Sequence, residues 1–326
     1  MADTTAPEIK PACCSPTLSP SVPSAFATHL ETALSVPKAA IETQAALKAE
    51  LRPIPGGFFD MGTRKSRFTE DHDTPRRKVK LSPYRIGATT VTNAQFARFV
   101  EETGYRTVSE TEGWSIVFHL FLDDLGTHPK SPPGLPWWRQ VEGASWRCPT
   151  GPKRNIEAQS DHPAIHLCWF DALAYCTWAR LKLPTEAQWE RAARGGLDKK
   201  KFPWGNSLHP DGKNMMNIWQ DDFSKQNTQE DCYLATAPAQ SYTPNGYGLY
   251  NMTGNVWEWV QDYYNDAPPP KAPLFDPKGP DMGLSRIQRG GSFLCHDSYC
   301  DRYHVHSRTH NDPDSATSHS GFRVAW

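Results

Sequence analysis

The chain has 326 residues, which is enough to bury a substantial core as one large domain or two modest ones. Its 35 Lys and Arg residues nearly balance its 36 Asp and Glu residues, so the composition gives no general attraction to nucleic acid or to an anionic membrane. No apolar run is long enough to span a membrane, and the first residues do not resemble a signal peptide. We therefore expect a soluble, cytoplasmic protein with no nucleic-acid or membrane partner.

The residue counts also bear on the kind of fold and on the use of cysteine. Twelve Trp, 29 Pro and 22 Gly residues favour irregular connections packed around aromatic anchors, with modest helix and strand content. Eight cysteines are too few for a disulfide scaffold in a chain of this length. In a reducing compartment, cysteines that lie close together more often serve redox chemistry or metal binding.

The N-terminal part of the chain is expected to lie outside the main domain. Residues 1–26 are rich in Pro, Ser, Ala and Thr and lack apolar periodicity, which is typical of a flexible tail. This tail contains the adjacent Cys13 and Cys14. Residues 27–51 are interpreted as an accessory helical segment, because 38–51 consist of good helix formers bounded by prolines.

The main domain, residues 52–326, should begin with two short strands. Apolar and polar residues alternate in the runs 54–62 and 76–87. A helix is expected to follow, because Thr92 can cap its first turn, Gln95 completes a capping box, and a glycine stands where the apolar periodicity ends.

The middle of the chain combines an irregular stretch with two predicted helices. Residues 105–165 show little periodicity but much Trp and Pro, which favours functional loops over disorder. Helices are expected within 168–180 and 183–196, and Thr185 with Gln188 forms a capping box at the start of the second.

The last third of the chain looks mostly irregular. The polar and aromatic segments 202–206, 217–233 and 245–262 are interpreted as loops. Residues 321–326, Gly-Phe-Arg-Val-Ala-Trp, are expected to form a core strand.

The stretch RGGSFLCHDSYC, residues 289–300, places Cys295 and Cys300 five positions apart. In a helix this separation rotates the second side chain about 140° from the first, and in a strand the two point to opposite faces. Only an intervening turn can bring the thiols together. Asp297 and Ser298 favour such a turn, because their side chains can bond to nearby backbone groups.

Three uses of such a thiol pair remain open on spacing alone. A structural disulfide is disfavoured by the short loop and the expected reducing compartment. A Cys2His2 zinc site would add His306 and His310, but only five residues separate Cys300 from His306, far fewer than in a zinc finger. A soft-metal or redox site agrees best, because two thiolates suit copper(I) and can also deliver a sulfur nucleophile or electrons.

The motifs around the thiol pair make a family resemblance specific. RGGSFLCHDSYCDRY (289–303), NGYGLYNMTGNVWEW (245–259) and NDPDSATSHSGFR (311–323) resemble the formylglycine-generating enzymes, copper-dependent oxidases that modify sulfatases. The similarity extends from about residue 52 to residue 326. It implies a single α+β domain with little regular secondary structure, related to the C-type-lectin-like fold.

The resemblance also implies a reaction and its partners. Such an enzyme uses O2 and a thiol reductant to convert the cysteine of a Cys-x-Pro-x-Arg motif, in an unfolded sulfatase segment, to formylglycine. We expect it to act as a monomer. Copper(I) suits the two cysteines, because it prefers sulfur and an incompletely coordinated ion can accept a third thiolate from the substrate.

The site residues implied by the resemblance surround the two cysteines. Cys295 and Cys300 would bind copper(I), and Ser292 and Tyr299 would place hydroxyls beside it. Trp257 would supply an aromatic side chain near the oxygen site. Without the resemblance, Ser292 is equally well explained as a turn cap and the two aromatic residues as core.

Two oxygen-rich segments are candidates for calcium, which needs six or more oxygen ligands and therefore favours irregular loops. Their spacings alone indicate only solvated acidic loops, and the calcium assignment comes from the resemblance. The first implied ligand set is Asn217, Ile218, Asp231 and Tyr233. The second is Asn251, Gly254, Val256 and Glu258.

One departure from the family and two rival functions are also considered. His304, His306 and His310 replace other residue types expected there, and histidines near a copper site would alter its ligation, pH dependence or substrate.

A rival function is a copper oxidase of the same fold that acts on another peptide or small thiol. A second rival is a non-catalytic, lectin-like binding module.

Overall fold

The computed structural model describes residues 16, 23–152, 158–267 and 272–326. The helices within these residues are α1 (Pro23–Ser35), α2 (Ile41–Ala49), α3 (Asn93–Thr103), α4 (Val108–Glu112), α5 (Trp169–Ala179) and α6 (Glu186–Ala193). The strands are β1 (Arg52–Ile54), β2 (Gly57–Met61), β3 (Arg77–Leu81), β4 (Tyr84–Ile86), β5 (Trp114–Phe118), β6 (Trp138–Glu142), β7 (Trp257–Tyr263), β8 (Leu274–Phe275), β9 (Arg286–Arg289), β10 (Arg308–Asn311) and β11 (Ser320–Phe322).

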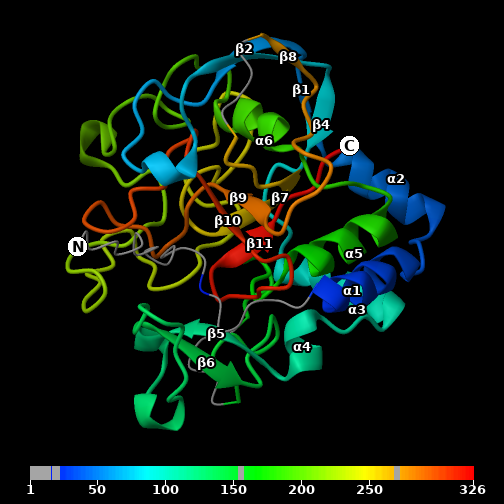
Figure 1. Ribbon diagram of the computed structural model, residues 1–326, viewed down its shortest axis with the longest axis vertical. Helices are drawn as coiled ribbons and strands as arrows, with labels where there is room; N and C mark the ends of the chain where they lie inside the picture. Colours follow the sequence, from blue (N-terminus) through cyan, green and yellow to red (C-terminus); the bar gives the residue numbers. More distant parts are fainter. Residues whose placement is uncertain (1–15, 17–22, 153–157, 268–271) are drawn as a thin grey trace, which may run out of the picture.

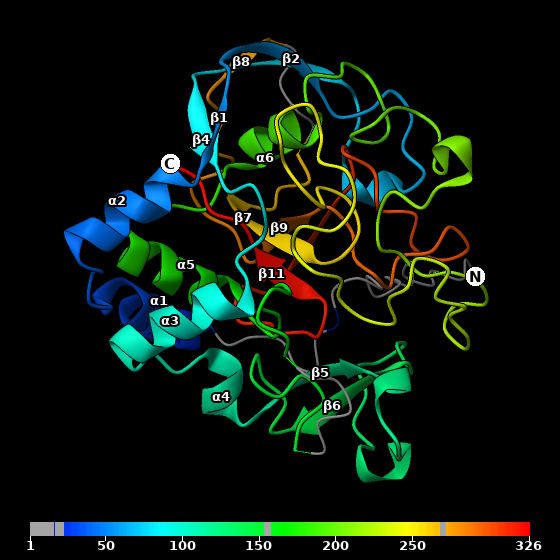
Figure 2. The same cartoon turned by 180° about the vertical axis from the view of Figure 1, so that it is seen from behind.

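These elements form one body around a four-stranded sheet with the order β10-β9-β7-β11. Helices α1, α2, α3 and α5 gather on one side of this sheet, and the loops that follow β9 lie on the other (Figures 1 and 2). The β5–β6 hairpin lies at one end of the molecule, and β1, β4, β2 and β8 lie at the opposite end. The predicted single domain of mixed helix and strand is confirmed.

The central sheet positions the segments that later form the site. Strand β11 pairs with β7 in parallel, with Ser320 opposite Trp257, while β9 runs antiparallel to β7. The turn after β9 and the segment before β11 therefore meet on the same part of the sheet. A parallel pair cannot be closed by a short hairpin, so the chain between β7 and β11 makes a long excursion that includes β9 and β10.

The N-terminal helices are packed against the body. Phe26 of α1 lies 5.9 Å from the ring of Phe170 of α5, which gives α1 an apolar surface to cover. Helix α1 begins at Pro23, ahead of the predicted end of the tail at residue 26. Apart from residue 16 and this first turn, the predicted tail lies outside the described residues, and so do Cys13 and Cys14.

The predicted helix caps are confirmed. The hydroxyl of Thr92 accepts from the backbone of Gln95, whose side chain accepts from the backbone of Thr92, and Thr185 makes the same exchange with Gln188. These reciprocal bonds satisfy donors that each helix end leaves open. No helix in the described part of the chain is both long and apolar enough to cross a membrane.

Strand β7 lies in a segment that was predicted to be loop. Its first four residues, from Trp257 to Val260, are all buried, so the strand shows no alternation of apolar and polar residues. A strand covered on both faces lacks the period-two pattern by which strands are recognised. Helix α4 and the hairpin β5–β6 likewise arise within 105–165, where no element was expected.

The largest apolar cluster joins α3 to α5 through aromatic contacts. Phe99 is fully buried, and its ring lies 5.6 Å from the rings of both Tyr175 and Trp178. Removing this ring would leave a cavity that its rigid neighbours cannot fill.

We predict that Phe99→Ala lowers the free energy of unfolding by about 4 kcal/mol. The matched control is Phe58→Ala, because Phe58 is 54% exposed and its loss should cost under about 1 kcal/mol. Urea unfolding followed by tryptophan fluorescence measures both variants. Equal losses for the two substitutions would contradict the assignment of this core.

Candidate active site

A turn after β9 brings the two predicted thiols together. Gly290 and Gly291 have positive φ angles of 100° and 77°, and a Cβ at Gly291 would lie only 2.9 Å from the carbonyl oxygen of Arg302. The amide of Cys300 then donates to the carbonyl of His296 at 2.8 Å. The Sγ atoms of Cys295 and Cys300 lie 3.3 Å apart, and both side chains are buried. The predicted convergence through a turn is therefore confirmed.

The base of this loop is closed by the buried side chain of Arg289. Its Nη1 and Nη2 atoms donate to the carbonyls of His306 and Val305, at 3.1 and 2.9 Å. The same two atoms contact the carboxylates of Glu186 and Glu190 on α6, at 3.1 and 2.6 Å. A single guanidinium thus joins the chain before the thiol loop to the chain after it and holds both against α6.

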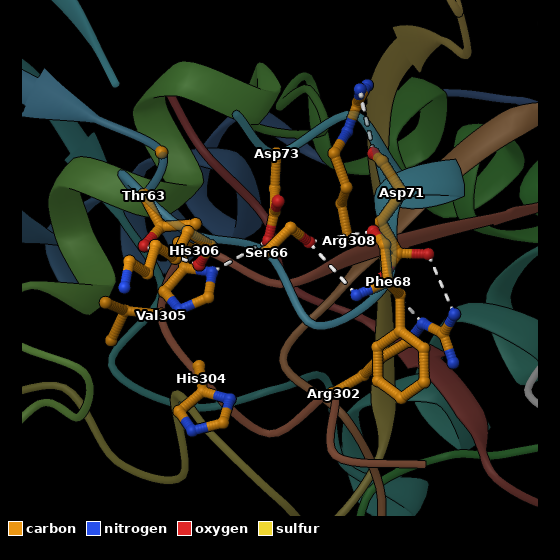
Figure 3. A network of polar contacts seen from close by, with 12 residues as sticks. Thr63, Ser66, Phe68, Asp71, Asp73, Arg302, His304, Val305, His306 and Arg308 are labelled. Carbon is orange, nitrogen blue, oxygen red and sulfur yellow. Dashed lines mark hydrogen bonds and ion pairs between the residues drawn. The ribbon is translucent and has the colours of Figure 1, made fainter. Parts of the chain in front are cut away.

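A second set of polar contacts holds the chain that leaves the loop. Arg302 forms a two-point ion pair with Asp71 at 2.7 and 2.9 Å and lies over the ring of Phe68. His306 bonds to the carboxylate of Asp73 at 2.9 Å. Figure 3 shows both partners coming from the segment between β2 and β3, which is distant in sequence from the loop.

The thiols face a pocket that is lined mainly by rings. The Tyr299 ring stacks on Phe223 at 5.0 Å and meets the edge of Trp137 at 5.0 Å. Ser292 lies against the thiols, because its amide donates to the Sγ of Cys295 at 3.4 Å. The pocket lining is Trp137, Trp138, Phe223, Trp257, Ser292, Leu294, Cys295, Tyr299, Cys300 and His319. All five predicted residues of the thiol site therefore meet in one place.

Two details of the pocket bear on its chemistry. The indole N–H of Trp257 is fully buried and has no hydrogen-bond partner within the described residues. No group of three or more His, Cys, Asp or Glu side chains in the described chain is arranged to hold a metal ion. The donor set is therefore two buried sulfurs, which fits a soft ion and leaves its remaining coordination to ligands from outside the chain.

The side chains of the histidines that follow the loop contact other residues than the two thiols. His304 stacks between the rings of Phe202 and His306, at 5.0 and 5.2 Å, and His310 stacks on Tyr264 at 3.8 Å. Burial lowers the pKa values of His304 and His310 to about 4, so both are neutral near pH 7. The Cys2His2 zinc arrangement is not assembled, because its two histidines are turned to other partners.

The first calcium set combines a buried amide oxygen with a buried carboxylate. The side-chain oxygen of Asn217 is buried and has no partner in the described chain. Asp231 accepts from the amides of Ile218 and Tyr233, and burial raises the pKa of its carboxyl. A buried carboxylate beside an unsatisfied amide oxygen fits a hard cation.

The second calcium set is organised differently. The side-chain oxygen of Asn251 is also buried without a partner in the described residues. Glu258, however, accepts from Arg323 at 2.8 and 2.9 Å and from the indole of Trp189 at 2.6 Å. Because this carboxylate is already paired with a buried cation, the second set does not fit calcium in this arrangement.

His319 is a pocket residue that sequence reasoning missed. It lies two residues before the Gly-Phe-Arg segment, and no periodicity or spacing marks it. Only the pairing of β11 with β7 brings it beside the thiols, since the amide of Trp257 donates to the carbonyl of His319 at 2.8 Å.

Comparison with known proteins places this site in a family. Residues 37–326 match the family described as the sulfatase-modifying factor enzyme 1-like domain. The chain belongs to this family. A relative from Thermomonospora curvata named formylglycine-generating enzyme is 50% identical over 282 residues, which are 83% of this chain and 91% of the relative.

Further comparisons separate fold from activity. A Mus musculus relative named inactive C-alpha-formylglycine-generating enzyme 2 is 40% identical over 276 residues, 83% of this chain and 84% of its own. The solved structure of PvdO from Pseudomonas aeruginosa is 23% identical with a TM-score of 0.60, over 84% of this chain and 93% of that chain. It supports the fold alone. Membership in the sulfatase-modifying factor enzyme 1-like family therefore has to be combined with the thiol site before an activity is assigned.

We predict that Arg302→Met lowers the free energy of unfolding by about 3 kcal/mol, because it leaves the buried Asp71 carboxylate without its cation. Burial raises the pKa of Asp71 to about 7, so the loss should be larger at pH 8, where the carboxylate is charged, than at pH 5. Urea unfolding at the two pH values measures this.

Arg67→Met is the matched control for that substitution. The Arg67 side chain is 49% exposed and pairs with Asp301 at the surface, so its loss should cost under about 1 kcal/mol at either pH. A loss for Arg302→Met that is as small as the control's would show that the Asp71 pair does not support the loop.

Proposed function

We propose that this protein converts a peptidyl cysteine in a sulfatase to formylglycine, using copper(I), O2 and a thiol reductant. The observation that carries the proposal is the buried pair of sulfurs, Cys295 and Cys300, which face each other at 3.3 Å in a ring-lined pocket. The 50% identity to a protein named formylglycine-generating enzyme supports the choice of reaction. The substrate would present its cysteine within a Cys-x-Pro-x-Arg motif of an unfolded segment.

Copper(I) would be held by the thiolates of Cys295 and Cys300 and would supply the dioxygen and one-electron chemistry that side chains lack. The substrate cysteine would enter as the third sulfur. In the net reaction, the CH2SH group, one O2, two electrons and two protons give an aldehyde, hydrogen sulfide and water. A thiol reductant supplies the electrons and protons and leaves as a disulfide.

The surrounding side chains would position the substrate and keep bulk water away. The rings of Phe223, Trp137 and Tyr299 contact one another and line the pocket with the two sulfurs. Such an apolar lining lowers the local dielectric and strengthens polar contacts inside. The hydroxyl of Ser292 already accepts from the amide of Leu294 and keeps its own hydrogen for a ligand in the pocket.

We predict that copper-loaded protein, incubated in air with a thiol reductant, converts the cysteine of a Cys-x-Pro-x-Arg peptide to formylglycine. Mass spectrometry should detect the replacement of CH2SH by CHO. Cys295→Ser and Cys300→Ser should each abolish the product, because one sulfur cannot hold the ion in the required geometry. Cys148→Ser is the matched control and should retain turnover, because Cys148 lies outside the pocket lining.

Each outcome of this experiment separates the rival functions. Tight copper binding through both cysteines without product would favour an oxidase that acts on another peptide or small thiol. Weak copper binding together with no product would favour a non-catalytic module, like the relative named inactive. Unchanged turnover in Cys295→Ser would contradict the proposed role of the thiol pair.

We further propose that calcium binds the first oxygen-rich set and stabilises the loops that carry it. The unsatisfied oxygen of Asn217 and the buried Asp231 carboxylate support this assignment. A bound ion would also offset the entropy lost in fixing an irregular backbone. The second set is not part of this proposal, because the Glu258 carboxylate is already paired with Arg323.

Removing calcium with EGTA should lower the melting temperature by roughly 5 °C. Asp231→Asn should melt lower than the parent and should no longer respond to EGTA, because it lacks the charged ligand. Asp222→Asn, in the same segment but with a 56% exposed side chain, should keep the response. Differential scanning calorimetry measures all three proteins, and a parent melting temperature that ignores EGTA would refute the calcium proposal.

A further inference from the structure

One wall of the thiol pocket is formed by the buried imidazole of His319. The side chain is part of the pocket lining that contains both cysteines, and only 1% of the residue is exposed. Its ring lies 4.8 Å from the ring of Trp138, in an edge contact. His319 is thus held inside the pocket rather than at its mouth.

The two ring nitrogens of His319 are in very different situations. Nδ1 lies 2.7 Å from the hydroxyl of Thr317. Nε2 is buried and has no hydrogen-bond partner within the described residues. Because Nδ1 is turned toward Thr317, the opposite edge of the ring, which carries Nε2, is the edge available to the pocket.

A chain of hydrogen bonds behind the ring allows Nδ1 of His319 to accept, which would place the proton on Nε2. The side-chain amide nitrogen of Gln288 can only donate, and it donates to the Ser320 hydroxyl at 3.0 Å. The Ser320 and Thr317 hydroxyls lie 2.7 Å apart, and either can be the donor. When Ser320 donates, the Thr317 hydrogen is left for Nδ1 of His319. In this arrangement, Nδ1 accepts and the hydrogen of the neutral ring sits on Nε2.

With Nδ1 accepting from Thr317, Nε2 of His319 carries a hydrogen that has no acceptor within the described residues. A buried N–H without an acceptor is unfavourable, and such groups in folded proteins call for an explanation. The indole N–H of Trp257, on the same pocket, is equally unsatisfied. Two buried ring nitrogens without partners in the described residues therefore belong to the lining of one pocket.

We propose that His319 contacts the substrate, and that its Nε2–H donates a hydrogen bond to the side-chain sulfur of the residue that enters the thiol pocket. The identity of that residue as a peptidyl cysteine rests on the function proposed above. The role of His319 is to orient the incoming sulfur relative to Cys295 and Cys300. A thiolate is a suitable acceptor, because hydrogen bonds to ionised groups are stronger than those between neutral groups.

The proposal is tested by comparing two peptides that cannot be turned over. Both carry the Cys-x-Pro-x-Arg motif, with serine in place of the cysteine in one and alanine in the other. Only the serine peptide has a side-chain acceptor. Copper-loaded parent protein should bind the serine peptide about 5-fold more tightly than the alanine peptide, as expected for one hydrogen bond. Fluorescence anisotropy of labelled peptides measures both dissociation constants.

Substitutions at His319 should change the ratio of these constants. His319→Phe keeps a ring against Trp138 but removes the donor, so its preference for serine should fall to about 1-fold. His319→Asn retains an N–H donor and should recover part of the preference. If His319→Phe folds and keeps the parent's preference, or if the parent has no preference, the inference is overturned.

A measurement without any substrate covers the case in which His319→Phe does not fold. Two-bond nitrogen–proton correlation spectra should show the Nε2–H tautomer of His319 in the parent. Thr317→Val interrupts the hydrogen-bond chain, so it should mix the tautomers and reduce the serine preference. A parent ring protonated on Nδ1 instead would overturn the inference.

These readouts also separate this inference from the proposed function. Formylglycine production by the parent, combined with equal binding of the serine and alanine peptides, refutes the role of His319 alone. A serine preference that disappears in His319→Phe, without any product from the cysteine peptide, refutes the oxidation but supports the contact.

Discussion

The geometry of the thiol site depends on one buried guanidinium. Arg289 stands at the end of β9, and its side chain bonds to the backbone of Val305 and His306 on the far side of the loop. Without these bonds, the chain that returns from the glycine-rich turn would depend on its other contacts, such as those of Arg302 and His306 with Asp71 and Asp73. Glu186 and Glu190 of α6 balance the buried charge, so the loop, the helix and the sheet are ordered together.

Such buried pairs are better regarded as a constraint on shape than as a source of stability. Desolvation offsets much of the attraction between two buried charges, whereas loss of one partner leaves the other charge unpaired at high cost. The same holds for Glu258 and Arg323, which pair beneath strand β7. These buried pairs can therefore hold the irregular segments around the site in one conformation, although the neighbouring β-strands are short. The apolar rings then close over a pocket whose walls are already fixed.

The sequence predicted the parts of the molecule that depend on local chemistry. Reciprocal caps at Thr92 and Thr185 are encoded within four residues, and the convergence of Cys295 and Cys300 follows from the turn between them. Strand β7 was missed, because burial on both faces removes the alternation that identifies a strand.

Residues that meet only through tertiary structure gave no local signal. His319 reaches the pocket because β11 pairs with β7. The guanidinium of Arg289 bonds to carbonyls that lie 16 and 17 residues further along the chain. The family resemblance predicted most of the site residues, which hydrophobic periodicity did not indicate. It did not indicate that Glu258 is held by Arg323, because a motif records residue types and not their partners.

The place of the C-terminal segment in the fold has a consequence for biosynthesis. The backbone of Trp326 exchanges two hydrogen bonds with Arg85 of β4, and Phe322 accepts from the amide of Val91. Backbone hydrogen bonds thus join the last residues of the sequence to a much earlier segment, and β11 adds the strand next to β7. During translation, the apolar core cannot be completed before this segment has left the ribosome. Shorter nascent chains lack one wall of the pocket and one strand of the sheet. Nascent chains of this domain therefore cannot complete the sheet or the pocket until residues 320–326 have been synthesised.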